Sequence, residues 1–190
     1  MLFSVLVSVV ALIFAGYFAK YVLRQGSGTF EMQQIAGAIR EGAEAFLKRQ
    51  YRTIGLMTLG LAVLMFIVYG MLKGWDTSAK MTVAFVLGAV CSALSGYIGM
   101  YISIRANVRT AHAARTNLSQ ALVIALRGGA VSGVTVVALS LLGVGGLYYL
   151  YGGMTDPEKV PFLIVGYGFG ASFVALCRVS HAALLCPASS

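Results

Sequence analysis

Residues 81–104 read MTVAFVLGAVCSALSGYIGMYISI and contain no charged side chain. A helix rises 1.5 Å per residue, so roughly 20 apolar residues cross a hydrocarbon core about 30 Å thick. Four other stretches are similarly apolar and carry charge only near the ends of two of them, at Lys20 and Arg178; they lie near residues 2–23, 53–72, 129–151 and 161–178. The sequence therefore predicts an all-α membrane protein of about five transmembrane helices that form a partial helix bundle.

The composition fits a bilayer better than water. Of the 190 residues, 59% are hydrophobic and only 11% are charged, and the mean hydropathy is +0.86. A soluble domain carries about a quarter of its residues as charged ones. The net charge of +8 fits basic anchors beside anionic lipid headgroups. The partner that these features predict is the lipid bilayer, and no nucleic-acid partner is expected.

Positive charge gathers on one set of loops. Most Lys and Arg residues fall in the connections 24–52 and 105–127. The positive-inside rule puts these connections in the cytoplasm, the N-terminus outside and the C-terminus inside. Lys20 and Arg24 follow the first apolar run, which favours a retained anchor over a cleaved signal. The opposite loops are short and carry Lys73, Asp76 and Lys80, then Asp156, Glu158 and Lys159.

The segment 30–52 has apolar residues at spacings of three and four, with charged residues largely between them. This pattern predicts an amphipathic helix. Thr29 is the expected N-cap, and Glu31 complements the positive start of the helix. Two interpretations stay open, a cytoplasmic platform continuous with the second span and a helix that lies on the membrane surface.

Small residues recur every four positions within the predicted spans. Such spacing lets helix backbones approach closely, so these positions are expected to pack against other helices. They are Gly88, Ser92 and Gly96 in the third span, Gly129 and Gly133 in the fourth, and Gly166 and Gly170 in the fifth.

Residues suited to catalysis or metal binding are scattered. Cys91, Cys177 and Cys186 show neither metal-ligand spacing nor a disulfide framework. His112 and His181 each lack a second ligand at suitable spacing. The six acidic residues are spread over the amphipathic segment and the outer loops. No catalytic, cofactor-binding or metal-ligating residue is therefore assigned in this chain.

Seven short strings carry a resemblance, and they occur in the same order as in one known family. They are EMQQIA (31–36), AIREGA (38–43), AFLKRQY (45–51), LSGYIGM (94–100), RANVRTA (105–111), ALRGGAV (125–131) and GYGFGAS (166–172). The chain resembles the N-terminal portion of membrane-integral, ion-pumping inorganic pyrophosphatases over residues 1–176.

The resemblance implies a pump of about sixteen transmembrane helices that couples cytoplasmic pyrophosphate hydrolysis to H⁺ or Na⁺ export. It also implies Mg²⁺ as cofactor, a homodimer, the remaining helices of the pump as partners and a prokaryotic inner membrane as location. The family-signature residues that it places on the cytoplasmic side are Arg40, Glu41, Arg49, Gln50, Tyr51, Arg105, Asn107, Arg109 and Arg127.

The family pattern ends near the fifth span, because residues 177–190 match nothing in it. Arg178 is the candidate for the family's ion-pathway arginine. The tail indicates a truncated or frameshifted copy, and an expression fragment is the other interpretation that stays open. The isolated chain is expected to be inactive because the pyrophosphate- and magnesium-binding residues of the family are missing. One alternative is a small self-standing structural or accessory membrane protein that oligomerises through Gly-rich helix faces. A compact oligomeric transporter is another, and it would depend on Arg178.

Overall fold

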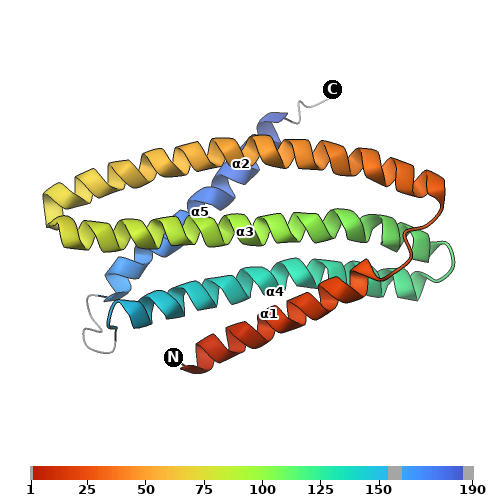
Figure 1. The fold of residues 1–190 in the computed structure, drawn as a ribbon, viewed down its shortest axis with the longest axis horizontal. Helices are drawn as coiled ribbons and strands as arrows, with labels where there is room; N and C mark the ends of the chain where they lie inside the picture. The colour runs from red at the N-terminus through yellow and green to blue at the C-terminus, as the bar shows by residue number, and fades with distance from the viewer. Residues whose placement is uncertain (1, 154–159, 186–190) are drawn as a thin grey trace. The chain divides into compact units, whose positions relative to one another are not determined.

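The computed structural model describes residues 2–153 and 160–185, and all the regular secondary structure within those ranges is helical (Figure 1). All five helices are long and apolar enough to cross a membrane. The predicted all-α membrane fold is therefore confirmed. The helices are α1 (Leu2–Leu23), α2 (Phe30–Lys73), α3 (Trp75–Ala114), α4 (Leu118–Leu150) and α5 (Val160–Leu185).

Two helices extend well beyond their predicted spans. Helix α2 joins the amphipathic segment 30–52 and the span 53–72 in one continuous helix, and α3 continues ten residues past Ile104. Apolar length sets the span, whereas turn and capping residues set the helix ends. Gly74 separates α2 from α3 with φ at +91°, a left-handed conformation that glycine adopts without strain.

The turn between α3 and α4 is built around Asn117. Its side-chain Oδ1 accepts hydrogen bonds from the backbone N–H groups of Ser119, at 3.0 Å, and Gln120, at 3.3 Å. These are the donors that an N-cap residue satisfies at the start of a helix. The cap ends the connection after three residues and starts α4 directly beside the end of α3.

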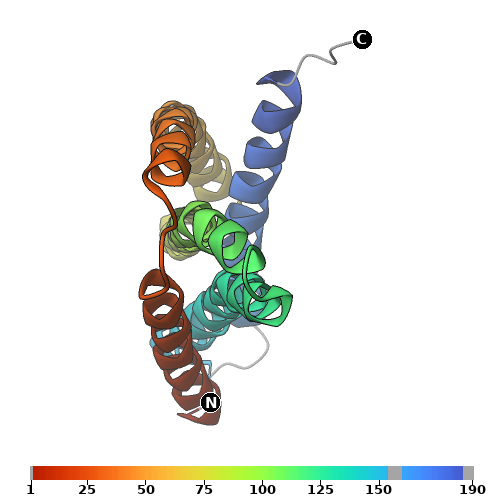
Figure 2. The ribbon, with the colours of Figure 1, turned by 90° about the vertical axis from the view of Figure 1, so that its right-hand side faces the viewer.

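The chain divides into two compact units. The first unit comprises residues 1–5, 48–94 and 140–190, and the second comprises residues 6–47 and 95–139. In the second unit, the link between α1 and α2 and the turn between α3 and α4 lie at the same end (Figures 1 and 2). The core of this unit is a cluster of buried residues from α1, α3 and α4, namely Val22, Ala106, Ala113, Ala121 and Ile124.

The first unit is held together by a close crossing of α3 and α5. A Cβ atom built at Gly88, Gly166 or Gly170 would collide with a carbonyl oxygen of the facing helix. The hydroxyl of Ser92 donates a 3.1 Å hydrogen bond to the carbonyl of Ala171 at the same crossing. Close approach of this kind is what small residues at four-residue spacing allow. The carbonyls that face the three glycines belong to Tyr167, Met81 and Phe85, respectively.

The other small residues singled out in the sequence have different surroundings. Gly96 is half-buried. A Cβ at Gly129 or Gly133 would meet no atom within 4 Å among the residues that the structure describes. The role of these two glycines in helix packing therefore stays a prediction.

Candidate functional site

The predicted signature residues fall into two groups, one in each unit. The second unit holds the larger group, at the end where α1 links to α2 and α3 turns into α4. This group consists of Arg40 and Glu41 on α2, Arg105, Asn107 and Arg109 on α3, and Arg127 on α4. The first unit holds Arg49, Gln50 and Tyr51 on α2 and Arg178 on α5.

Arg109 fastens the end of α1 to α3. Its Nε donates to the backbone oxygen of Gln25 and its Nη2 to that of Leu23, both at 3.2 Å. Its Nη1 donates to the carbonyl of Arg105 at 2.7 Å. The last carbonyls of a helix lack partners within the helix, and a cation there also favours the negative end of the helix dipole. Arg109 thus supplies a C-terminal cap for α1 from a different helix.

Arg109 is half-buried and follows the predicted span 81–104. Burial lowers the pKa of its guanidinium, and the nearby charge of Arg105 lowers it further. An arginine keeps its proton through such changes, because its ordinary pKa lies far above neutral pH. The guanidinium of Arg109 therefore stays positively charged while it donates to the carbonyl oxygens at the end of α1.

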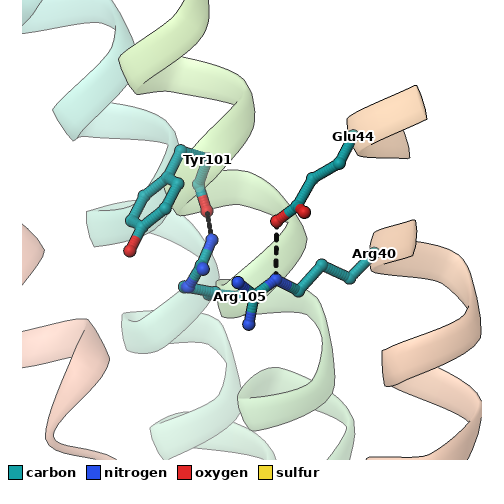
Figure 3. A network of polar contacts seen from close by, with 4 residues as sticks. All are labelled: Arg40, Glu44, Tyr101 and Arg105. Carbon is teal, nitrogen blue, oxygen red and sulfur yellow. Dashed lines mark hydrogen bonds and ion pairs between the residues drawn. The ribbon is translucent and has the colours of Figure 1, made fainter. Parts of the chain in front are cut away.

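Arg105 stacks on an aromatic ring of its own helix. Its guanidinium carbon lies 3.4 Å from the centroid of the Tyr101 ring, and Nη1 donates a 3.2 Å hydrogen bond to the Tyr101 carbonyl. Figure 3 shows this pair with Arg40 and Glu44, which come from α2. The contact of a cation with a ring face is favourable and leaves other N–H groups of the guanidinium available.

Arg40 and Glu44 form an exposed ion pair, with 2.7 Å between Nε and Oε1 (Figure 3). The hydrogen bond and charge of Arg40 lower the pKa of Glu44, and Arg105 adds a smaller effect. A lowered pKa in the folded state means that this pair stabilises the fold at neutral pH and loses its effect as pH falls through that pKa. Glu41 is exposed on the same helix.

Arg127 covers aromatic rings of α1. Its guanidinium carbon lies 3.9 Å from the centroid of Tyr21 and 5.9 Å from that of Phe18. Arg127 lies on α4, between two and three turns after the capped start of the helix. Arg105 and Arg127 therefore each present a guanidinium over an aromatic side chain in the second unit.

Asn107 lines an apolar groove between α2 and α3. The groove has a volume of about 340 Å³, and Ile35 and Ile39 on its α2 side are 64% and 59% exposed. The apolar face of the amphipathic segment is therefore only partly covered by α3. The other lining residues are Met32, Ala36, Ile104, Val108 and Ala111.

The signature residues of the first unit make structural hydrogen bonds. Gln50 is only 4% exposed, and its Nε2 donates to the backbone oxygen of Arg178 at 3.1 Å. The hydroxyl of Tyr51 donates to the carbonyl of Ala93 at 2.7 Å. Both bonds join helices that are distant in sequence. Arg49 is exposed on α2.

His112 was not among the predicted site residues, but it packs against the link between α1 and α2. A Cβ on Gly26 or Gly28 would lie 3.4 Å from its side chain. Its Nδ1 is buried and has no hydrogen-bond partner among the residues that the structure describes. The signal in the sequence is its position three residues after Arg109, which puts both side chains on the same face of α3.

No group of three or more His, Cys, Asp or Glu side chains in the described part of the chain is arranged to hold a metal ion. Asp156, Glu158, Lys159 and Cys186 lie outside the described residues, as does the end of the predicted tail at 186–190. The side chain of His181 is also not described.

Comparison with known proteins identifies the family. The family model described as "Inorganic H+ pyrophosphatase" matches residues 9–180. The chain belongs to this family. The resemblance that the sequence motifs predicted to membrane-integral, ion-pumping pyrophosphatases is thus confirmed.

Individual members of the pyrophosphatase family give the extent of the match. The chain is 54% identical to the "K(+)-insensitive pyrophosphate-energized proton pump 2" of Moorella thermoacetica, over 88% of this chain and 24% of the relative. It is 42% identical to the "Pyrophosphate-energized membrane proton pump 3" of Arabidopsis thaliana and 41% identical to the "Putative K(+)-stimulated pyrophosphate-energized sodium pump" of Clostridium tetani. Both of these matches cover 92% of this chain and 24% of the relative.

The chain therefore spans about a quarter of the length of the curated relatives that it matches. This share agrees with the expected resemblance to the N-terminal portion of a pump. The matched residues 9–180 include the arginines at the α3–α4 end of the second unit, which is called its basic end below. They also include the glycines at the α3–α5 crossing of the first unit.

Proposed function

We propose that this chain supplies scaffold helices of a pyrophosphate-energised ion pump and does not hydrolyse pyrophosphate by itself. The observation that carries the proposal is the close crossing of α3 and α5 at Gly88, Gly166 and Gly170, in a chain that matches a quarter of the pumps' length. Such a crossing fixes two helices against each other and leaves no room for a ligand between them. Its contribution is therefore a rigid support for other helices.

The family implies Mg²⁺, but the described residues do not fit it. Magnesium prefers oxygen ligands, usually one or two carboxylates with substrate phosphates. Of the described acids, Glu44 is paired with Arg40 and Asp76 is paired with Lys80, 2.8 Å away. Among the side chains that the structure describes, no three or more His, Cys, Asp or Glu are arranged to hold a metal ion. A complete pump would thus bind Mg²⁺ and pyrophosphate through residues elsewhere, and no catalytic step is assigned to this chain.

The orientation and assembly follow from the charges and the family. The basic connections face the cytoplasm of a prokaryotic plasma membrane, the N-terminus lies outside and the C-terminus lies inside. The support is the excess of Lys and Arg in 24–52 and 105–127. The partners in this proposal are the remaining helices of a pump and a second copy of the assembled pump.

A complementation assay tests the proposal. The chain would be expressed alone, or together with a polypeptide covering the other three quarters of the Moorella thermoacetica pump, and magnesium-dependent pyrophosphate hydrolysis would be measured in the membranes. We expect no activity above empty membranes from either polypeptide alone and clear activity from the pair. Hydrolysis by this chain alone would overturn the proposal, as would failure of the pair when both polypeptides are present in the membrane.

A second candidate is a small accessory protein that oligomerises through Gly-rich faces. The observation that favours it is the open surface at Gly129 and Gly133 on α4. A discrete oligomer of the purified chain, dissociated by Gly133→Leu and unaffected by co-expression with the complementary polypeptide, would favour this function over the scaffold of a pump.

A further inference from the structure

An apolar groove lies among α1, α3 and α4 in the second unit. It has a volume of about 310 Å³ and is lined by Ala15 and Gly16 of α1, Tyr97 and Tyr101 of α3, and Val131 of α4, among others. Its volume lies at the lower end of the range for ligand pockets, about 300–1,000 Å³. Nearly all its lining is apolar, and its position within predicted spans suits a hydrocarbon chain.

Two cations stand at one end of this groove. Arg105 follows Tyr101 by one turn of α3, and its guanidinium stacks on the Tyr101 ring that lines the groove. Arg127 precedes Val131 by one turn of α4 and stacks on Tyr21 of α1. Figure 3 shows the Tyr101 ring on the side of Arg105 away from Arg40 and Glu44. The groove thus has an apolar body and a basic end.

The two cations have no carboxylate partner in the described part of the chain. Neither Arg105 nor Arg127 forms an ion pair there. Residues 95–139 contain four arginines and no Asp or Glu. The charge of Arg105 has a small effect on Glu44, but the ion pair of Glu44 is with Arg40. The arginines sit just outside the predicted spans 81–104 and 129–151, at the depth of lipid headgroups. Lipid headgroups at this depth carry phosphate groups, and a guanidinium binds phosphate well.

We propose that this groove binds an anionic phospholipid, with an acyl chain along Ala15, Gly16 and Tyr97 and the phosphate near Arg105 and Arg127. The apolar lining accounts for the chain, and the unpaired basic end accounts for the preference for a net negative headgroup. A zwitterionic lipid would bring a second, positive group to the same two arginines. The proposal rests on the membrane location of the chain and is independent of the pump assignment.

Native mass spectrometry of the detergent-purified full chain tests the proposal. Dioleoylphosphatidylglycerol and dioleoylphosphatidylcholine would be titrated separately, and the affinity for the first bound lipid compared. We expect a preference for phosphatidylglycerol. Each basic residue near a membrane surface contributes roughly a fivefold gain in affinity for anionic lipid. Arg105→Gln and Arg127→Gln should each remove about that factor, whereas the exposed Arg115→Gln should leave the preference unchanged.

A second variant tests the groove without altering charge. Gly16→Phe fills open space in the groove, because a Cβ there meets no atom within 4 Å, and it should weaken binding of phosphatidylglycerol. Gly60→Phe, at an equally open position on α2, is the matched control and should have no effect. Equal binding of the two lipids, or an unchanged preference in Gly16→Phe, would overturn the proposal. Displacement of phosphatidylglycerol by millimolar inorganic phosphate would also overturn it, since the site would then recognise free phosphate alone.

Discussion

At the scale of single residues, Arg109 carries the most informative contacts in the basic end of the second unit. The motif RANVRTA at 105–111 singled it out as a family-signature residue. Its partners, Leu23 and Gln25, could not be predicted, since they lie 86 and 84 residues away in the chain. A motif identifies a residue type at a position, but a cap supplied by another helix depends on how the helices pack.

Replacing Arg109 tests this cap. Arg109→Gln removes the charge and the two bonds to the end of α1, so we expect that end to open more often. Hydrogen bonds to charged groups contribute about 1.5–3 kcal/mol to stability, and the half-buried position of Arg109 favours the lower end of that range. Hydrogen exchange at the amides of Arg24 and Gln25 should therefore accelerate roughly tenfold. Arg115→Gln, at an exposed position, is the control, and equal protection in both variants would contradict the assignment.

At the scale of helices, hydropathy predicted which segments are helical but not where the helices end. The spans 53–72 and 81–104 mark the apolar parts of α2 and α3, while α2 begins at Phe30, far before its span, and α3 continues to Ala114, past its span. The α3–α5 crossing was predicted only in part. Four-residue spacing marked Gly88, Gly166 and Gly170, but it marked Gly129 and Gly133 equally, and spacing carries no information on which helix faces which.

A pair of substitutions on one helix tests the crossing. Gly170→Ala would put a methyl group against the carbonyl of Phe85, whereas Gly168→Ala, two residues earlier on α5, would meet no atom within 4 Å. Forcing an extra group into packed space costs about 1–3 kcal/mol. We expect Gly170→Ala to lower the apparent Tm of the detergent-solubilised chain, measured with a fluorescent fusion, and Gly168→Ala to leave it unchanged or raise it. Equal Tm values would show that α3 and α5 do not cross this closely.

At the scale of the whole molecule, the arrangement of charge across the membrane is the property that connects sequence to topology. Arg105 and Arg127, at the basic end of the proposed lipid groove, are among the residues on which the positive-inside prediction depends. One distribution of charge therefore has two consequences, the orientation of the chain and the preference for anionic lipid at one end.

Cysteine labelling in intact cells separates the two orientations. In a chain with its three cysteines replaced by Ala, Ser119→Cys reports the start of α4 and Ala79→Cys the start of α3, both exposed positions. Since the basic connection 105–127 is proposed to face the cytoplasm, a membrane-impermeant maleimide should label Ala79→Cys in intact cells. It should label Ser119→Cys only after the membrane is opened. The reverse pattern would place the basic end outside, and the anionic lipid of the proposed groove would then have to come from the outer leaflet.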